Sequence, residues 1–589
     1  MTDDRLTRRE VVRTVPGVGL LGTGFGWETV GSKNSISAET AETDYVESLQ
    51  SMYPQTAKLL AEDRDAGDTF GSAVAVSDDG RTVLIGAEDD EDPNGSIGDV
   101  GAGSVYVFAR DDTGWNQDTK LIPSDGDPAD QFGNSVALSS DGTTALIGAH
   151  NDAEPNGTAD GSDWLRNGGD IPGGSGSAYL FSRNQSGWEQ QTKIAADDGD
   201  SVHYFGYSVS LTSNGDTALV GAMNANDSLG AAYLFTRDSG GWSQEATLTA
   251  NDVDAAGVFA SRVEISDKGQ TVIVSAPGDT NSNGEDAGSV YVFVSDGGSW
   301  REQAKIIPNS GDAGDRFGAS VDTVSNGDMI TIGAVDDAPT DGGSGSVDRT
   351  GSVYVFQRTD GNWGKQAKIT ANDSASGDQF GGSVAVTGNG DTVIVGASNN
   401  DNPGDSSGSQ LDNSGAAYVF SRVDGDWTQQ VKLVARNPNS NAQLGDQVAL
   451  SSGGAVTVIG APAYEGTNAT SGGQLSGAGS AYVFGRIDSG QNNGSSGNAA
   501  GSSSTNRTAQ GGTGNATGTP SETERRQKYN TQSGEQNGTA KEGNSDPLAV
   551  LEEFSQNNPL PLTLLGGGII AGVGAGVYRR YRDIKEHKE

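Results

Sequence analysis

The chain has 589 residues, a length that allows several domains or one large repeat architecture. It contains no cysteine, which excludes disulfides, thiolate zinc sites and a cysteine nucleophile. Its 37 basic and 79 acidic residues give a net charge of −42, which argues against a nucleic-acid partner because phosphates would be repelled.

The composition also points to a fold class and a habitat. A total of 89 glycines and a hydrophobic fraction of 33% favour short strands joined by many turns over packed helices. A charge of this size destabilises a compact chain by self-repulsion unless salt screens it, and molar salt shortens the Debye length to about 3 Å. The excess of aspartate over lysine resembles that of haloarchaeal proteins and predicts a halophilic source.

Residues 1–37 are predicted to be an export signal. The stretch Thr7-Arg8-Arg9-Glu10-Val11-Val12 precedes a mildly apolar, glycine-rich run from Val15 to Phe25. This arrangement resembles a twin-arginine signal, which is an address read by a receptor and not a membrane anchor. We therefore expect the chain to be exported.

Residues 50–488 contain seven copies of one repeat. In each copy a Phe-Gly pair or a variant comes first, then a β-branched run ending in Gly-Ala or Ser-Ala, then a Gly-[Ser/Ala]-[Val/Ala]-Tyr-[Val/Leu]-Phe segment. A tryptophan follows six of these segments. The repeated tyrosines are Tyr106, Tyr179, Tyr233, Tyr291, Tyr354, Tyr418 and Tyr482.

Each repeat reads as four short strands, which we call A (Phe-Gly), B (Gly-Ala), C (Tyr) and D (Trp). Tight turns such as Asp78-Asp79-Gly80 join A to B. One four-stranded sheet cannot bury both faces alone, so the sheets must stack radially as the blades of a propeller. The fold class predicted is therefore all-β, a seven-bladed β-propeller.

The seventh repeat lacks a D strand after its tyrosine segment. Tyr53 stands five residues before Lys58-Leu59-Leu60, which matches the interval from tryptophan to lysine in the other repeats. We therefore expect the N-terminal strand to complete the last blade, which removes free sheet edges.

The connections from strand B to strand C are the long ones, and several of them alternate oxygen-bearing residues before a glycine. Calcium takes six to eight oxygen ligands, which this pattern could supply. Asp, Asn and Gly are also ordinary turn formers, so the calcium site and the plain turn both stay open. The candidate ligands are Asp90, Asp92 and Asn94 in the first repeat and Asp279, Asn281, Asn283 and Glu285 in the fourth.

The longest of these connections contains Trp164, which does not belong to the repeat. It is either a platform on which a sugar ring stacks or a plug that packs onto the disc. The three histidines, His150, His203 and His587, form no Ser-His-Asp or metal-binding pattern at a recognisable spacing. We therefore predict no catalytic residue, no cofactor besides calcium and no enzymatic activity.

The C-terminal part is predicted to be a stalk and an anchor. Residues 489–558 are rich in Gly, Ser, Asn and Thr and cannot bury enough surface to order. Residues 559–578 contain an uncharged stretch just long enough for a transmembrane helix. The basic tail, residues 579–589, should stay cytoplasmic, which places everything before the helix outside the cell.

The repeats resemble the FG-GAP repeat family, the propeller repeat also found in integrin α subunits, over roughly residues 50–487. The resemblance implies a binding or adhesion propeller at the cell surface, and we expect its B–C and D–A loops to bind an extracellular protein or glycan. The integrin pattern places a calcium loop between the first two strands of a blade. Here that connection is a tight turn, so those metal positions do not carry over.

Two other functions remain open. Carboxylate pairs abound, so a surface carbohydrate-active or other hydrolytic enzyme on a propeller scaffold is one alternative. A structural component of the cell envelope without a discrete ligand is the other.

Overall fold

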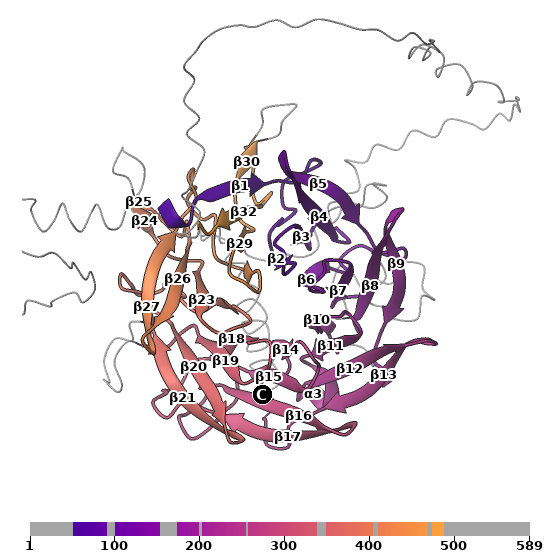
Figure 1. The fold of residues 1–589 in the computed structure, drawn as a ribbon, viewed down its shortest axis with the longest axis vertical. Helices are drawn as coiled ribbons and strands as arrows, with labels where there is room; N and C mark the ends of the chain where they lie inside the picture. Colours follow the sequence, from indigo (N-terminus) through magenta and orange to yellow (C-terminus); the bar gives the residue numbers. More distant parts are fainter. Residues whose placement is uncertain are drawn as a thin grey trace, which may run out of the picture. The chain divides into compact units, whose positions relative to one another are not determined.

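Seven antiparallel sheets of four strands each surround a common axis (Figure 1). The computed structural model describes residues 51–90, 101–152, 174–198, 203–254, 257–338, 349–403, 410–467 and 474–487. In every blade strand A lies nearest the axis and strand D lies at the rim (Figure 1). The predicted all-β, seven-bladed propeller is confirmed.

The strands follow the predicted A, B, C, D order. Blade one contains β2 (Ala73–Val76), β3 (Thr82–Ala87), β4 (Ser104–Asp111) and β5 (Gly114–Leu121). Blade two contains β6 (Phe132–Leu138), β7 (Thr144–Ala149), β8 (Ser177–Asn184) and β9 (Gly187–Ile194). Blade three contains β10 (Phe205–Leu211), β11 (Thr217–Ala222), β12 (Ala231–Asp238) and β13 (Gly241–Leu248). Blade four contains β14 (Val263–Ile265), β15 (Thr271–Ala276), β16 (Ser289–Asp296) and β17 (Ser299–Ile306).

The remaining blades repeat the pattern. Blade five contains β18 (Phe317–Thr323), β19 (Met329–Ala334), β20 (Ser352–Thr359) and β21 (Asn362–Ile369). Blade six contains β22 (Ser383–Val386), β23 (Thr392–Ala397), β26 (Ala416–Val423) and β27 (Asp426–Leu433). Blade seven contains β28 (Val448–Leu450), β29 (Val456–Ala461), β32 (Ser480–Gly485) and β1 (Gln55–Leu59). Two small ribbons, β24 (Asn402–Pro403) with β25 (Gln410–Leu411) and β30 (Gly466–Thr467) with β31 (Gln474–Leu475), extend B–C connections.

The N-terminal strand closes the ring. β1 pairs antiparallel with β32, and in this register Lys58 lies opposite Tyr482. The same tyrosine-to-lysine pairing joins strands C and D in other blades, as at Tyr106 and Lys120. The prediction that the first strand completes the last blade is confirmed.

Aromatic side chains form the hydrophobic core between neighbouring blades. Phe70 makes edge-on contacts with Tyr106 and Phe108, with ring centroids 5.3 and 6.0 Å apart. The same buried cluster includes Val458 and Val483 of blade seven, so it joins two blades. Equivalent Phe–Tyr pairs recur around the ring, because a phenylalanine or, once, a leucine lies at the start of each A strand or a few residues before it.

The glycine of the Gly-Ala pair lets adjacent blades approach at the level of their backbones. A Cβ atom on Gly86 would lie 2.1 Å from the carbonyl oxygen of Gly133, in the next blade. At the closing seam a Cβ on Gly460 would lie 2.1 Å from the carbonyl oxygen of Gly71. The seam between the last and first blades therefore uses the same close contact as the covalently continuous junctions.

The predicted terminal segments lie outside the described residues. These are the export signal (1–37), the stalk (489–558), the transmembrane helix (559–578) and the basic tail (579–589). Among the described ranges no helix has the length and apolar character needed to cross a bilayer.

Candidate functional site

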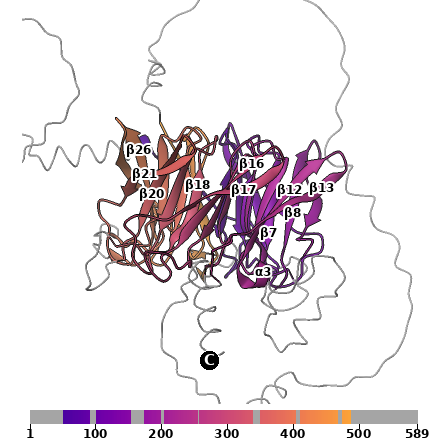
Figure 2. The ribbon, with the colours of Figure 1, turned by 90° about the horizontal axis from the view of Figure 1, so that it is seen from below.

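The B–C and D–A connections emerge on one face of the propeller, and the A–B turns emerge on the other. Figure 2 shows the disc from its side, with the short helix α3 (Ala225–Ser228), which belongs to the B–C connection of blade three, at one face. The ends of the B strands and the beginnings of the A strands lie on this same face, closest to the axis.

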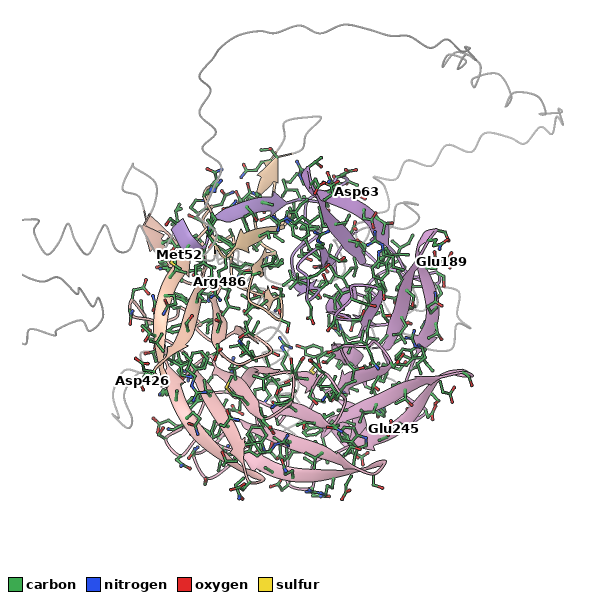
Figure 3. The ribbon with its side chains drawn as sticks, viewed as in Figure 1. Met52, Asp63, Glu189, Glu245, Asp426 and Arg486 are labelled. Atoms are coloured by element: carbon green, nitrogen blue, oxygen red, sulfur yellow. The ribbon has the colours of Figure 1, made fainter. Side chains whose placement is uncertain are left out.

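Five side chains from five blades gather there, and we call them the channel-mouth cluster. Glu88 and His150 directly follow the B strands of blades one and two. Tyr207, Arg262 and Asp446 come from the beginnings of the A strands of blades three, four and seven. Figure 3 shows side chains of the innermost strands around the axis of the ring.

Direct contacts join the members of the cluster. The ring of His150 meets that of Tyr207 edge-on, with centroids 5.3 Å apart. Arg262 comes from blade four, the next blade after that of Tyr207, and its guanidinium carbon lies 5.9 Å from the centroid of the Tyr207 ring. Asn134, from blade two, donates a hydrogen bond of 3.0 Å to the backbone oxygen of Tyr207. These contacts join three members across blades two, three and four, while Glu88 and Asp446 act on the others through their charges.

Burial shifts the titration of its ionisable members. Glu88 is only 8% exposed, and burial, with the charges of Asp89 and Asp446, raises its pKa to about 8. Burial raises the pKa of Asp446 to about 6, although the charge of Arg262 opposes the shift. Burial lowers the pKa of His150 to about 4, so its imidazole is neutral at pH 7. At neutral pH the cluster combines a largely protonated carboxyl, a guanidinium whose charge acts on Asp446, and a neutral imidazole.

Three buried polar atoms beside this cluster have no hydrogen-bond partner among the described residues. They are Oγ of Ser72, Oδ1 of Asn134 and Nδ1 of His150. Ser72 and Asn134 follow the glycine that opens strand A, the position that Tyr207 and Asp446 hold in their blades. Unsatisfied buried polar atoms are costly, so a group that enters the channel mouth and bonds to them gains binding energy.

We expect the substitution Glu88→Gln to stabilise the protein at high pH. The carboxyl has a folded-state pKa near 8 against an ordinary value of 4.5, so the folded state binds its proton more tightly. The free energy of unfolding of the wild type should therefore fall as pH rises from about 4.5 to about 8, and the amide should remove at least about 2 kcal/mol of that fall. Denaturant titrations across this pH range measure it. Glu189→Gln, at the rim of blade two (Figure 3), should leave the profile unchanged; an unchanged profile for Glu88→Gln would contradict the assignment.

The first residue of each predicted calcium loop has a lysine as its partner. In blades one, two, four and five, the aspartate four residues after the Gly or Ser of strand B accepts a hydrogen bond from a serine of strand C. The same carboxylate pairs with a lysine of strand D at 2.6 to 2.8 Å. We call each such trio a clasp, and the members are Asp90, Ser104 and Lys120; Asp152, Ser177 and Lys193; Asp279, Ser289 and Lys305; Asp337, Ser352 and Lys368.

The other predicted calcium ligands serve the turn or lie outside the described ranges. Asn281 and Asn283 bond to backbone groups, with Nδ2 donating to Gly288 and Pro308 at 2.7 Å. Glu285 is exposed. Asp92, Asn94 and Trp164 lie outside the described residues. No group of three or more His, Asp or Glu side chains in the described ranges is placed to hold a metal ion. Calcium binding stays a prediction, and at Asp90 or Asp279 the ion would compete with a lysine.

Sequence reasoning missed most of the channel-mouth cluster. A signal was nevertheless present, because the two positions after the opening glycine of strand A hold mostly small residues, and Tyr207 and Arg262 depart from that pattern. Glu88 and Asp446 lie far apart in the chain, and only the closed ring brings them to one end of the axis.

Comparison with known proteins identifies the repeat. The FG-GAP repeat model matches residues 53–108, 115–165, 188–235, 242–293, 300–356, 363–420 and 427–484, more than half of the chain. Each match begins at a tryptophan within a D strand or, in the first match, at Tyr53 just before β1, so one repeat spans parts of two blades. No curated protein matches the chain. Among solved structures, a chain of the hydrazine synthase of Kuenenia stuttgartiensis is 15% identical, with a TM-score of 0.42, over 69% of this chain and 95% of that chain.

Proposed function

The chain belongs to the FG-GAP repeat family, and on that premise we propose that it is a binding protein that recognises an extracellular protein or glycan through the B–C and D–A face. The observation that carries the proposal is the channel-mouth cluster, where Glu88, His150 and Arg262 converge around Tyr207. Convergent polar groups beside an aromatic ring, several with perturbed pKa values, are typical of a ligand site.

The chemistry of the cluster favours a polar ligand of low net charge. A protonated carboxyl, an amide oxygen, a neutral imidazole and a hydroxyl supply both donors and acceptors at neutral pH. The tyrosine ring adds an apolar face. Hydroxyl-rich sugars and the polar side chains of a protein loop both suit these groups, and we propose that the protein acts by binding and not by catalysis.

We further propose that the propeller is displayed on the cell surface. The twin arginine at Arg8 and Arg9 and the uncharged stretch within residues 559–578 support this topology independently, because one directs export and the other is followed by basic residues. The excess of acidic residues supports a halophilic source.

The binding proposal is tested with the full-length protein on a panel of immobilised oligosaccharides and solubilised envelope proteins. We expect a specific interaction that weakens at least about tenfold in Arg262→Gln, because the guanidinium and its contact with Tyr207 are lost. Arg237→Gln is the matched control, since Arg237 pairs with Asp216 on the outer part of blade three, where both side chains are more than a third exposed. Full binding by Arg262→Gln would place recognition elsewhere, and polysaccharide turnover would favour the enzyme alternative.

A further inference from the structure

The lysine of strand D has a carboxylate partner in five blades but not in blade seven. Lys120, Lys193, Lys305 and Lys368 pair with the aspartates of their clasps, and Lys432 pairs with Asp373 at 2.8 Å. Lys58, which takes this position in blade seven, has no ion pair with any described residue. In a protein with a net charge of −42, a half-buried lysine without a carboxylate is an exception.

At the clasp position of blade seven, another residue replaces the aspartate. In the clasps, the backbone N–H of the aspartate bonds to the alanine that ends strand B, and its carbonyl accepts from the glycine before strand C, as at Asp90. Tyr464 makes both of these bonds in blade seven, with Ala461 at 3.2 Å and Gly479 at 3.1 Å. Tyr464 therefore stands where the other clasps have aspartate.

The groups that would bind that carboxylate are still present. Ser480 corresponds to the clasp serines, is fully buried, and hydrogen-bonds to the side chain of Tyr482 in place of a carboxylate. The ammonium of Lys58 lies 3.2 Å from the centroid of Tyr464 and 5.3 Å from that of Tyr482. Arg64 adds a second positive charge close enough to perturb Lys58.

Arg64 is itself only partly satisfied. Its two terminal nitrogens donate to the backbone oxygens of Ala61 and Thr467, at 3.1 and 3.2 Å, which fixes the guanidinium in place. Its buried Nε has no hydrogen-bond partner among the described residues. Two cations and one buried hydroxyl donor thus lie together at the seam of the ring without an anion from the described chain.

We propose that Lys58, Arg64 and Ser480 form a binding site for a carboxylate that is supplied by a ligand or a partner. The incoming carboxylate would take over the role that the aspartate has in the clasps, accepting from the serine hydroxyl and pairing with the lysine. Tyr464 contributes a ring that the ammonium already contacts, and it must turn aside or frame the bound group. The inference stands apart from the channel-mouth cluster and does not depend on the ligand of that cluster.

The test measures how fast the amine of Lys58 is chemically modified with and without a bound carboxylate. Burial, with the charge of Arg64, lowers the pKa of Lys58 to about 8, so a large fraction of the amine is unprotonated and nucleophilic at that pH. Full-length protein is treated with a limiting amount of an acetylating N-hydroxysuccinimide ester, and the modification of each lysine is followed by peptide mass spectrometry. A bound carboxylate raises the pKa of the amine and should slow its modification several-fold.

Three anions distinguish the sources at equal ionic strength. Protection of Lys58 by sodium acetate, relative to sodium chloride, supports a site for small free carboxylates. Protection by an oligoglutamate peptide but not by acetate supports a site for an acidic segment of a partner. Equal modification of Lys58 in all three solutions overturns the proposal.

Two controls, a second lysine and a variant of Tyr464, show whether the protection is specific to Lys58. Lys120 has internal carboxylates at 2.7 and 2.8 Å, so its modification should not respond to any of the anions. The variant Tyr464→Asp should rebuild the clasp, protect Lys58 without added anion and abolish the response to acetate and oligoglutamate. Persistence of that response in Tyr464→Asp would also contradict the assignment.

Discussion

Alanine in place of Gly460 should destabilise the propeller by about 3 kcal/mol, near the upper end of the range for overpacked sites. The added Cβ would lie 2.1 Å from the carbonyl oxygen of Gly71. Both sides of this contact are backbone, so no side-chain rotation relieves it. The two blades would have to move apart, and the closed ring transmits that movement to the other junctions.

The measurement is denaturant unfolding at constant salt, with Gly364→Ala as the control. Gly364 lies in an exposed part of β21, and a Cβ there meets no atom within 4 Å. That control should stay within about 0.5 kcal/mol of the wild type. Equal stability of the two variants would mean that the last and first blades do not meet as closely as the glycine contact requires.

Changing Asp279 to Asn should cost about 1.5 to 3 kcal/mol, because it removes the buried one of the two carboxylates that pair with Lys305 and leaves only the exposed carboxylate of Asp252, at 3.2 Å. Asp279 is fully buried, and its carboxylate pairs with Lys305 at 2.8 Å and accepts from Ser289 at 2.5 Å. The amide keeps the size of the side chain but removes the charge. The free energy of unfolding from denaturant titration measures the effect.

The pH dependence of this clasp has a definite sign. Burial lowers the pKa of Lys305, but the hydrogen bonds and charges of Asp279 and, less strongly, Asp252 outweigh it and hold the pKa above its ordinary value of 10.5. The contribution of Lys305 is therefore fully present below pH 10.5 and is lost as pH rises through the folded-state pKa. Asp279→Asn should flatten this loss.

An exposed ion pair provides the control for the clasp. Asp216 pairs with Arg237 at 2.6 Å, but 48% of the Asp216 side chain is exposed. Asp216→Asn should therefore change the stability by less than about 1 kcal/mol. If Asp279→Asn were as mild, the ion pair of Lys305 with Asp252 would be sufficient and the buried carboxylate would add little.

The fold could be read from the sequence because its signals are local and repeated. Gly-Ala and Phe-Gly pairs recur where backbones meet, and the interval from Tyr53 to Lys58 matches the tryptophan-to-lysine interval of other D strands. That interval was enough to predict the pairing of β1 with β32, although Lys58 and Tyr482 are far apart in the chain.

The site could be predicted only in part because its contacts are not local. Asp90 and Asp279 fit a calcium spacing, and nothing within their own loops shows that a lysine from strand D reaches them. The lysines of the D strands recur regularly in the sequence. Which carboxylates they pair with depends on how the four strands of a blade are arranged in the sheet. The face proposed for binding was chosen from loop length, whereas the residues at its centre come from five blades.

The pairing of β1 with β32 also constrains when the protein can reach its final form. Lys58 leaves the ribosome early, and Tyr482, its partner across the last sheet, leaves more than four hundred residues later. Until then the growing chain exposes an incomplete stack of blades to proteases and to other nascent chains. Closure of the ring must therefore wait until the last blade has been synthesised, and a folded-state export route would have to wait for this long-range step.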